Sequence, residues 1–375
     1  MRVLHIHSGN LYGGVETLLA TLARTGAACP SMESQFALCF DERLAGELRD
    51  AGARVHALGR ARVRSPLGLR RARLALGDLL RRERFDVAVC HSAWSQAVLG
   101  PAVRASGVPL VLWLHAATDG RHWLERWARR TPPRAVVCNS RFTAAALPRL
   151  YKDVRAEVVH CPVAPPPGVS PGERARVRAE LDTPASSTVI IQVSRMERWK
   201  GHEAHLDALK VSEGAGDWVC WFVGGAQRPA EVEYVRALRE RADRLGIAAR
   251  VRFVGQRADV PRLLAAADIF CQPNTEPEPF GLVFVEALRS RLPVVTTDLG
   301  GAREIVEKSC GVLVPRGDTA ALGGALRTLV ENPSLRARLG GRGPERARKL
   351  CDPTTQLARL HEVLEGCMRK VTVTA

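Results

Sequence analysis

Short apolar runs alternate with amphipathic segments along nearly the whole chain. Runs rich in valine, isoleucine and leucine are typical of strands that are buried on both faces of a parallel sheet. Such runs lie at residues 2–7, 35–40, 53–58, 85–90, 108–115 and 134–139, and again at 188–194, 217–225, 251–255, 268–273, 292–298 and 311–315. Because helical patterns separate most of them, the sequence predicts an α/β fold with parallel sheets covered by helices.

The helical patterns are clearest in the second half of the chain. Apolar residues recur there with the spacing of one helical face, so we expect helices in each of these segments. They lie at about 202–212, 230–245, 281–290, 318–331, 334–349 and 354–370.

The alternation is interrupted once, by the segment "CPVAPPPGVSPG" at residues 161–172. Its prolines break both helix and strand, and the segment has no apolar period, so it predicts an interdomain linker. We therefore expect a doubly wound, Rossmann-like domain at 1–165 and a second one at 166–352, facing a cleft, with a final helix at 353–375 that crosses back to the first domain. Ligands of such sheets bind beyond the carboxyl ends of the strands.

A glycine loop follows the first predicted strand. The loop "SGNLYGG" ends in Gly13 and Gly14, which open a helix. Glycine lets a ligand come close to the backbone, and the free N–H groups at a helix start favour an anion. The spacing differs from the dinucleotide fingerprint G-x-G-x-x-G, and a tight strand-to-helix turn would explain the same residues.

Polar rings end two of the apolar runs. His115 is the last residue of "VPLVLWLH", where its ring would face the cleft and could donate to a sugar hydroxyl. The alternative is a structural histidine with satisfied hydrogen bonds. His7, at the end of the first run, is a further candidate, and His5 is assigned to the core.

The loop "SRMERWKG", which follows the first strand of the second domain, is basic. The guanidinium of Arg195 and the ammonium of Lys200 could clamp a diphosphate and stabilise it as it leaves with extra charge. Arg198 lies between them, so the assignment within the loop is open. A solvated basic loop is the alternative interpretation.

The segment "EPEPFGLVFVEAL", residues 276–288, is acidic before Gly281 and apolar after it. Glu278 lies in the loop before a predicted helix and Glu286 lies within that helix, so the two should not form one catalytic pair. A loop carboxylate can hold sugar hydroxyls, whereas a helical one can accept hydrogen bonds from two vicinal ribose hydroxyls. The first N–H groups of the helix add an anion site.

The motif "EPFGLVFVEA" resembles the E-x-F-G-x4-E signature of the retaining GT-B glycosyltransferases called family 4. Nearly the whole chain takes part in the resemblance, because other features follow in the order of that family. They are the glycines at 13–14, His115, the Arg195/Lys200 loop, "FVGG" at 222–225 and "TDLGGAREIV" at 297–306.

The resemblance implies a role for each matching residue. Glu278 would contact the hydroxyls of the donor sugar, His115 the transferred sugar, and Arg195 and Lys200 the diphosphate; these are the expected catalytic residues. Glu286 would bind the ribose. The other implied donor-binding residues are Gly13, Gly14, Phe280, Gly281, Leu282 and, at the border of the base, Arg257.

The chain departs from the family pattern in two places. "HCPV" at 160–163 lacks the Asn-Gly that often follows this strand, which puts the hinge contacts in doubt. The chain also has no D-x-D triplet, so we expect neither a metal ion nor another cofactor. Positive side chains and helix termini would take over the work of the metal.

The net charge of +16 changes the picture only locally. Of the 55 basic residues only six are lysine, a bias that GC-rich coding explains as well as selection for binding does. The arginine clusters lack the interleaved aromatic residues and the reading motif of a nucleic-acid site, so we expect no nucleic acid as a partner. Between Arg60 and Arg84, however, Leu69, Leu76 and Leu80 share one helical face and arginines, among them Arg70, Arg71 and Arg73, cover much of the rest. This helix could lie on an anionic membrane, or could be an ordinary domain helix with a basic face.

The absence of a long apolar run or a leader pattern predicts a cytoplasmic protein, peripheral to the inner face of the plasma membrane if the basic helix binds there. The ten cysteines form no C-x-x-C pair, and buried free thiols are expected.

The predicted activity is transfer of a sugar, with retained configuration, from a nucleoside-diphosphate sugar to a saccharide or lipid-linked acceptor in cell-surface glycan, lipopolysaccharide or exopolysaccharide biosynthesis. Three alternatives remain: glycosylation of a small metabolite, a sugar-nucleotide epimerase, and a non-catalytic membrane-surface protein. An epimerase would convert the donor without an acceptor, and the non-catalytic protein would bind anionic liposomes but remain inert.

Overall fold

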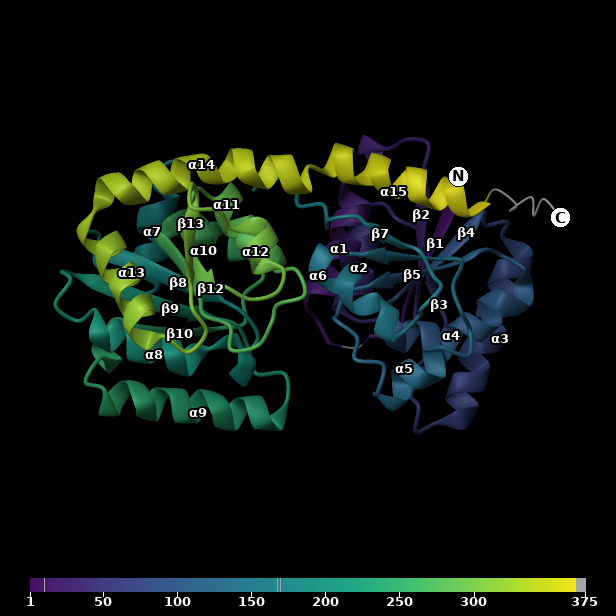
Figure 1. Ribbon diagram of the computed structural model, residues 1–375, viewed down its shortest axis with the longest axis horizontal. Helices are drawn as coiled ribbons and strands as arrows, with labels where there is room; N and C mark the ends of the chain where they lie inside the picture. The colour runs from purple at the N-terminus through teal and green to yellow at the C-terminus, as the bar shows by residue number, and fades with distance from the viewer. Residues whose placement is uncertain (10, 167, 169, 369–375) are drawn as a thin grey trace. The chain divides into compact units, whose positions relative to one another are not determined.

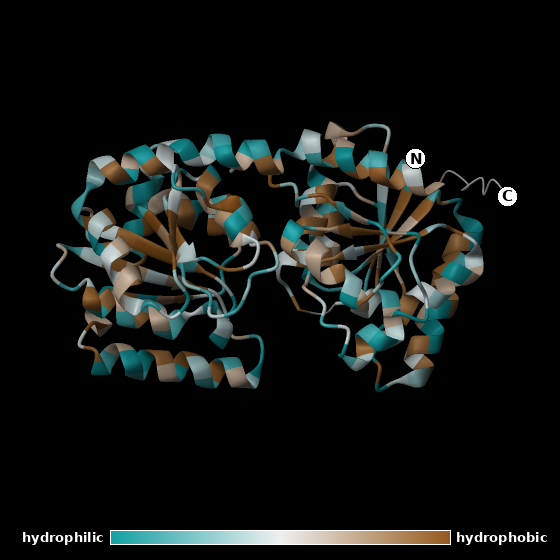
Figure 2. Cartoon of the chain, in the orientation of Figure 1, coloured by the Kyte–Doolittle hydropathy of each residue, from teal (hydrophilic) through white to brown (hydrophobic). Residues whose placement is uncertain are grey.

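The chain divides into two compact units in the computed structural model, which describes residues 1–9, 11–166, 168 and 170–368. One unit comprises Met1–Ala164 together with the segment that begins at Cys351, and the other comprises Pro165–Leu350. Each unit contains its own sheet with helices packed around it (Figure 1). Apolar residues concentrate on the central strands, whereas the helices mix polar and apolar residues along their length (Figure 2).

The first unit is built on a parallel sheet with the strand order β3-β2-β1-β4-β5-β6-β7. The order reverses between β1 and β4, as in doubly wound folds, so the carboxyl ends of these neighbours border a crevice. The strands are β1 (Arg2–His7), β2 (Glu33–Leu38), β3 (Val55–Ala57), β4 (Val87–His91), β5 (Leu110–Leu114), β6 (Ala135–Cys138) and β7 (Ala156–Val158).

Helices connect the strands of the first unit. They are α1 (Gly14–Arg24), η1 (Gly26–Ala28), α2 (Arg43–Asp50), α3 (Pro66–Arg82), α4 (Ser92–Ser106), α5 (Trp123–Ala128), α6 (Arg141–Ala146), η2 (Leu147–Arg149) and α15 (Pro353–Met368). In α3, Ser65 caps the first turn by accepting from the Gly68 N–H. Of the leucines that share one face of this helix, Leu76 and Leu80 are buried and Leu69 is partly buried against the core, as in an ordinary domain helix. Helix α15 contacts β4 and η1, so it packs on the first unit.

The second unit repeats the plan with the parallel order β10-β9-β8-β11-β12-β13, and here the order reverses between β8 and β11. Its strands are β8 (Thr188–Val193), β9 (Trp218–Val223), β10 (Val251–Gly255), β11 (Ile269–Gln272), β12 (Val294–Thr297) and β13 (Gly311–Val314). Its helices are α7 (Glu173–Glu180), η3 (Arg198–Lys200), α8 (His202–Val211), α9 (Pro229–Arg244), η4 (Ala248–Arg250), α10 (Val260–Ala266), α11 (Leu282–Arg289), α12 (Ala302–Ile305), α13 (Thr319–Glu331) and α14 (Pro333–Cys351).

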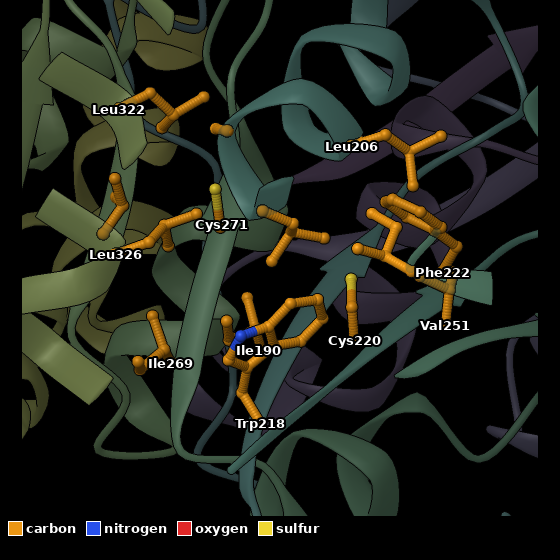
Figure 3. Close-up of a cluster of buried hydrophobic side chains, with 14 of the residues drawn as sticks. Ile190, Leu206, Trp218, Cys220, Phe222, Val251, Ile269, Cys271, Leu322 and Leu326 are labelled. Atoms are coloured by element: carbon orange, nitrogen blue, oxygen red, sulfur yellow. The ribbon is translucent and has the colours of Figure 1, made fainter. Parts of the chain in front are cut away.

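The second unit has a continuous apolar core between its sheet and the covering helices (Figure 3). Ile190 and Phe222 from the strands meet Leu206 of α8 and Leu326 of α13, and all four are fully buried. Burial of apolar side chains of this size stabilises the fold by roughly 1.5–3 kcal/mol each. This core holds the strands rigidly, so the loops at their carboxyl ends have a fixed base.

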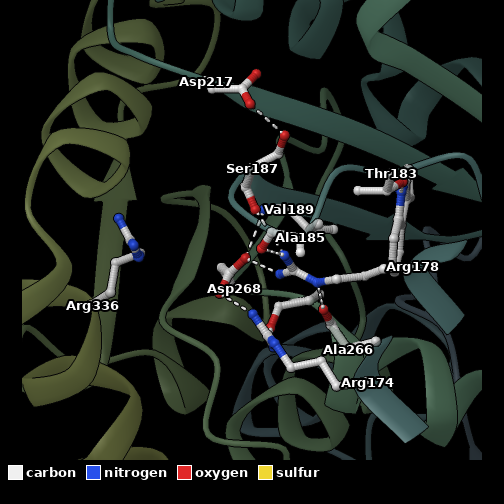
Figure 4. A network of polar contacts seen from close by, with 12 residues as sticks. Arg174, Arg178, Thr183, Ala185, Ser187, Val189, Asp217, Ala266, Asp268 and Arg336 are labelled. Carbon is white, nitrogen blue, oxygen red and sulfur yellow. Dashed lines mark hydrogen bonds and ion pairs between the residues drawn. The ribbon is translucent and has the colours of Figure 1, made fainter. Parts of the chain in front are cut away.

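A polar network closes the opposite end of this sheet (Figure 4). The buried guanidinium of Arg178 in α7 donates to the Asp268 carboxylate at 2.6 Å and to the Ser187 carbonyl at 2.9 Å. Asp268 also accepts from the Val189 N–H at 2.7 Å. Arg174 also pairs with Asp268, so one carboxylate holds two guanidiniums, and the network anchors α7 beneath the sheet and leaves the other end for ligands.

The secondary structure agrees with the sequence predictions except at the short edge strand β7, which is not among the predicted runs because its residues are exposed or half-buried. The helices expected in the second half of the chain are confirmed, with bounds shifted by one or two residues. Residues 161–166, 168 and 170–172 of the predicted linker contain neither helix nor strand. Residues 167 and 169 of the linker, and 369–370 of the predicted last helix, lie outside the described residues. All ten cysteines are free and buried, which confirms that expectation.

Candidate functional site

The predicted diphosphate loop and the predicted sugar loop follow neighbouring strands of the second sheet. Arg195 and Lys200 come after β8, and Glu278 comes after β11, on either side of the point where the strand order reverses. This point is where open α/β sheets bind their ligands. The parallel sheet therefore brings together residues that are far apart in the sequence.

Lys200 and Glu278 form an ion pair. The ammonium of Lys200 lies 2.6 Å from Glu278 Oε2, and the two side chains are only 13% and 11% exposed. The Asn274 side-chain amide donates to the same oxygen at 3.1 Å. Both charged residues are predicted from the sequence in separate roles, but the sequence carries no signal for their direct contact or for Asn274.

Two further contacts fix the backbone at Lys200. Its carbonyl accepts from the side-chain amide of Gln192 at 2.9 Å, and Gln192 is held in turn by His205 of α8 at 2.8 Å. Gly201 adopts a φ of +75°, and a Cβ there would lie 1.8 Å from the Pro273 carbonyl oxygen. Glycine is therefore required for the loop after β8 to approach the loop after β11.

The arginine and aromatic residues of the same loop surround this ion pair. Arg195 donates to Glu197 at 2.5 Å, and Glu197 also accepts from the Trp199 indole at 3.0 Å. The ammonium of Lys200 lies 3.8 Å from the centroid of the Trp199 ring, a cation–π contact. Neither Glu197 nor Trp199 is singled out by the sequence, although both lie between the two named cations.

Arg198 takes a different direction. Its guanidinium pairs with Glu203 at 2.7 Å, lies over the Tyr234 ring and is 72% exposed. The sequence left the assignment within this loop open, and the structure separates an exposed Arg198 from a largely buried Lys200.

The glutamate loop is held by a second pair of glycines, which follow β12. The N–H of Gly301 donates to the Glu278 carbonyl at 2.7 Å, and a Cβ on Gly300 would lie 2.3 Å from that oxygen. Gly281, at φ +99°, then caps α11, after the buried Phe280 and before the partly exposed Leu282. Helix α11 begins four residues after Glu278, and its first N–H groups have no partner within the helix.

Glu286 lies on α11 and differs from Glu278 in having no cation beside it. Its carboxylate makes no hydrogen bond or ion pair with another residue in the part of the chain that the structure describes. The surrounding protein encloses the carboxylate, although the side chain keeps a partly exposed surface, and this burial raises its pKa to about 7. A buried carboxylate without partners is stabilised by a ligand that donates hydrogen bonds to it.

Arg257, expected at the border of the base, has its guanidinium occupied. It donates to Asp259 at 2.7 and 2.8 Å and to Glu180 at 2.6 Å. These partners hold the side chain beside the loop after β10, and its contact with a base stays a prediction.

In the first unit, the glycine loop is organised by a glutamate that the sequence analysis misses. Glu16 accepts from the Gly13 N–H at 2.9 Å and lies 2.7 Å from Nε2 of the buried His7. Glu16 lies three residues after Gly13, the N-cap of α1. This is the spacing of a capping box, so the sequence does contain a signal for Glu16. The loop conformation before Gly14 is therefore set by α1 itself.

His115 lies directly after β5, as predicted, and is hydrogen-bonded rather than isolated. Its Nε2 lies 3.0 Å from Nδ1 of His91, the last residue of the neighbouring strand β4. Burial is the main cause that lowers the pKa of His115 to about 3, so the ring is neutral at physiological pH. A neutral imidazole can donate to or accept from a sugar hydroxyl.

The two Rossmann-like units, with a charged site at the switch point of the second, define a GT-B glycosyltransferase. Two family models match the chain, "Glycosyltransferase Family 4" over residues 12–165 and "Glycosyl transferases group 1" over residues 173–346. Together they cover both domains. The chain belongs to the family 4 group of GT-B glycosyltransferases, and it is a transferase enzyme.

Similar proteins agree with this assignment. The phosphatidyl-myo-inositol mannosyltransferase of Mycobacterium leprae is 29% identical over 298 residues, which are 77% of this chain and 76% of that protein. The lipopolysaccharide core biosynthesis glycosyltransferase LpsE of Rhizobium meliloti is 32% identical over 169 residues, about half of each protein. The crystal structure of Anabaena HepE in complex with UDP-glucose has a TM-score of 0.85 and 26% identity, covering 98% of this chain and all of that one.

Proposed function

We propose that the protein transfers a sugar, with retained anomeric configuration, from a nucleoside-diphosphate sugar to an acceptor hydroxyl in the synthesis of a cell-surface glycan or glycolipid. The observation that carries the proposal is the buried Lys200–Glu278 ion pair at the switch point of the second sheet. A cation held beside a carboxylate suits a ligand with a diphosphate next to a polyhydroxylated ring. The similarity to HepE, solved with UDP-glucose, supports a donor of this class.

Each donor group has a chemically matched partner in this proposal. Lys200 and Arg195 hold the diphosphate, together with the N–H groups that begin α11. Glu278 uses its carboxylate for the sugar hydroxyls, while Lys200 and Asn274 keep that carboxylate in place. Glu286 accepts hydrogen bonds from the ribose hydroxyls, and Arg257 borders the base.

The reaction needs charge stabilisation more than a strong base. The bond between the anomeric carbon and the phosphate oxygen breaks, the acceptor oxygen bonds to that carbon, and the acceptor proton passes to the leaving phosphate. Lys200 and Arg195 stabilise the charge that develops on the diphosphate, so we propose that no metal ion is needed. The neutral ring of His115 would orient the transferred sugar.

Thermal unfolding in EDTA with UDP, GDP, ADP and their sugar conjugates tests the donor site. A ligand at about 100 times its dissociation constant stabilises the folded protein by roughly 2.7 kcal/mol. We expect a rise in Tm with one nucleotide, and no such rise in Glu286→Ala. A folded protein that responds to none of these ligands would contradict the proposed donor class.

For the acceptor, we propose a membrane-embedded lipid or lipid-linked saccharide, reached by binding of α3 to the anionic inner face of the plasma membrane. Arg70 and Arg71 on α3 are exposed, beside Leu67 and Leu74, which are 69% and 56% exposed. Arginines next to exposed leucines favour an anionic bilayer surface. Over the described residues, no helix is both long and apolar enough to pass through a membrane.

Arg73 does not belong to this surface, although the sequence groups it with its neighbours. Its guanidinium donates to the Val98 carbonyl at 2.7 Å and lies over the Trp127 ring.

The membrane proposal is tested by co-sedimentation with phosphatidylglycerol vesicles of the wild type and of Arg70→Glu/Arg71→Glu, with Arg236→Glu on the exposed face of α9 as control. Loss of binding in the double variant alone is expected, and unchanged binding would contradict the membrane proposal.

A further inference from the structure

A row of buried imidazoles crosses the sheet of the first unit. His5 of β1, His91 of β4 and His115 after β5 lie on three strands that are neighbours in the sheet, and Ser34 lies on β2, the next neighbour. The register pairs Ser34 with Val3 and His91 with Trp113, so the four residues share one face of the sheet. The opposite face packs against α3 and α4.

Hydrogen bonds join these side chains end to end. The Ser34 hydroxyl lies 3.3 Å from His5 Nε2, and His5 Nδ1 lies 3.0 Å from His91 Nε2. His91 Nδ1 lies 3.0 Å from His115 Nε2, and the planes of these two rings differ by only 6°. His5 and His91 have no exposed surface, whereas Ser34 and His115 at the two ends are partly exposed.

The rings in this row are neutral. Burial lowers the pKa of His5 and of His115 to about 3, and burial together with the neighbouring histidines lowers the pKa of His91 well below its ordinary value. A neutral imidazole carries one proton, so one of its nitrogens donates and the other accepts. Each contact in the row must therefore join a donor to an acceptor.

This requirement couples the tautomers of all three rings. If Ser34 donates to His5, every ring carries its proton on Nδ1, and Nδ1 of His115 is a donor. If Ser34 accepts from His5, every ring carries its proton on Nε2, and Nδ1 of His115 is an acceptor. A serine hydroxyl can serve both arrangements, but a mixture would bring two protons or two lone pairs together inside the protein.

We propose that His91 and His5 are positioning residues, which couple the tautomer of His115 to their own and so to whether its Nδ1 donates to or accepts from the substrate. The coupling of tautomers stands on the hydrogen bonds above. Its consequence for turnover rests on the proposed contact of His115 with the transferred sugar. If the row served only to pair buried ring nitrogens with one another, the tautomer of His115 would not matter for substrate binding.

Nitrogen NMR of the full chain labelled with ¹⁵N-histidine tests the coupling directly, because protonated and unprotonated ring nitrogens have different shifts. Signals are assigned by their loss in single variants. We expect His5, His91 and His115 to show the same tautomer. In His91→Phe, which keeps a ring but no ring nitrogen, we expect His115 to become a mixture of tautomers.

His91→Asn is the matched rescue variant, because its side-chain amide lies where Nδ1 of His91 contacts His115. We expect it to restore one tautomer at His115, while Ser34→Val, compared with Ser34→Thr, perturbs the row from its far end. Different tautomers within the wild-type row, or a single unchanged tautomer at His115 in His91→Phe, would overturn the proposal. These spectra need no substrate.

Turnover of UDP-glucose, used as the probe donor, gives a separate readout. We expect kcat to fall about tenfold in His91→Phe, the loss of roughly one positioned hydrogen bond, with KM for UDP-glucose nearly unchanged and partial recovery in His91→Asn. An unchanged kcat beside a shifted tautomer would contradict the effect on turnover. No turnover of any donor by the wild type would instead count against the proposed function, and the spectra would still decide on the coupling.

Discussion

The polar residues at the two switch points differ in charge, although the two sheets follow the same strand order up to the sixth strand. In the first domain, His91 and His115 are neutral rings that contact each other through ring nitrogens. In the second domain, Lys200 and Glu278 form an ion pair of which little is exposed. The same architecture therefore supports a neutral histidine pair after β4 and β5 in one domain, where the carboxylate of Glu16 lies beside His7 at the end of β1, and an ion pair in the other.

In the proposed function, the difference follows from what each site recognises. A diphosphate gains charge as it leaves, so cations fixed in advance lower the barrier without reorganising during the reaction. A sugar hydroxyl gains no comparable charge, so no interaction would offset the desolvation cost of a buried cation beside it. Variants of either site test whether this division between charged and neutral chemistry persists.

The largest effect is expected for Lys200→Met. The change leaves the Glu278 carboxylate without its cation in a buried position, which destabilises a protein by about 3–5 kcal/mol. Loss of a cation that stabilises the leaving diphosphate should also lower kcat by about 10²–10³. Urea unfolding and initial-rate kinetics with the donor identified by thermal shift measure the two effects.

The double variant Lys200→Met/Glu278→Gln separates them. Without a buried charge, it should recover much of the lost stability but none of the activity. A double variant that regained activity would show that the ion pair serves only the fold, and the contrast between the two domains would lose its functional meaning.

The next effect concerns the glycines that hold the charged site. Gly300→Ala and Gly317→Ala both place a side chain at positive φ, +56° and +77°, which costs about 1–2 kcal/mol. A Cβ at Gly300 would also meet the Glu278 carbonyl at 2.3 Å, whereas Gly317 has no atom within 4 Å. We expect Gly300→Ala alone to lose a further 1–3 kcal/mol or so and to bind the donor about tenfold more weakly. Calorimetric titration and urea unfolding of both variants test this, and equal behaviour would contradict it.

Much of the fold follows from the sequence because each element carries its own signal. The apolar runs and helical periods mark the two parallel sheets, and the E-x-F-G-x4-E spacing marks the segment from Glu278 to Glu286. The ion pair between Lys200 and Glu278 has no such signal. The two residues are 78 positions apart, and only the pairing of β8 with β11 brings their loops together.

The histidine row shows the same limit in the other domain. The sequence identifies His115 from its place at a strand end, but assigns His5 to the core as a single residue. His5, His91 and His115 meet only because β1, β4 and β5 are adjacent in the sheet and because the register puts their side chains on one face. Residue type and strand position are visible in one sequence, whereas lateral contacts depend on strand order.

Glu286 is a carboxylate without a cation beside it, and its titration should make the stability of the protein depend on pH. Its pKa of about 7 in the folded protein exceeds its ordinary value of 4.5, so the folded state keeps a proton that the unfolded state releases. Stability should therefore fall as pH rises from about 5 to 7, at up to about 1.4 kcal/mol per pH unit, and level off above that range. Urea unfolding from pH 5 to 8 should show this fall in the wild type and less of it in Glu286→Gln.

Donor binding should change in the opposite direction. The ionised carboxylate accepts stronger hydrogen bonds from ribose hydroxyls than the neutral acid does. The affinity for UDP-glucose, whose phosphates do not titrate in this range, should rise several-fold between pH 6 and pH 8, by an amount set by linkage to one proton. Titration calorimetry at both values measures it, and a Glu286→Gln variant with the same rise would assign the effect to another group.

The smallest effect separates the two arginines of the diphosphate loop. Arg195 is 30% exposed and pairs with Glu197, which is also held by Trp199, whereas Arg198 is 72% exposed and pairs with the half-exposed Glu203. An exposed ion pair contributes about 0.2–1 kcal/mol, so Arg198→Ala should change stability little and donor affinity less than about twofold. Arg195→Ala should weaken donor binding about tenfold, the loss of one charge-assisted contact. Calorimetric titration of both variants with the same donor measures the two losses of affinity.

Equal losses would mean that the loop attracts the diphosphate by its total charge and not by the position of Arg195. The contrast between the charged and the neutral site would then rest on Lys200 and Glu278 alone.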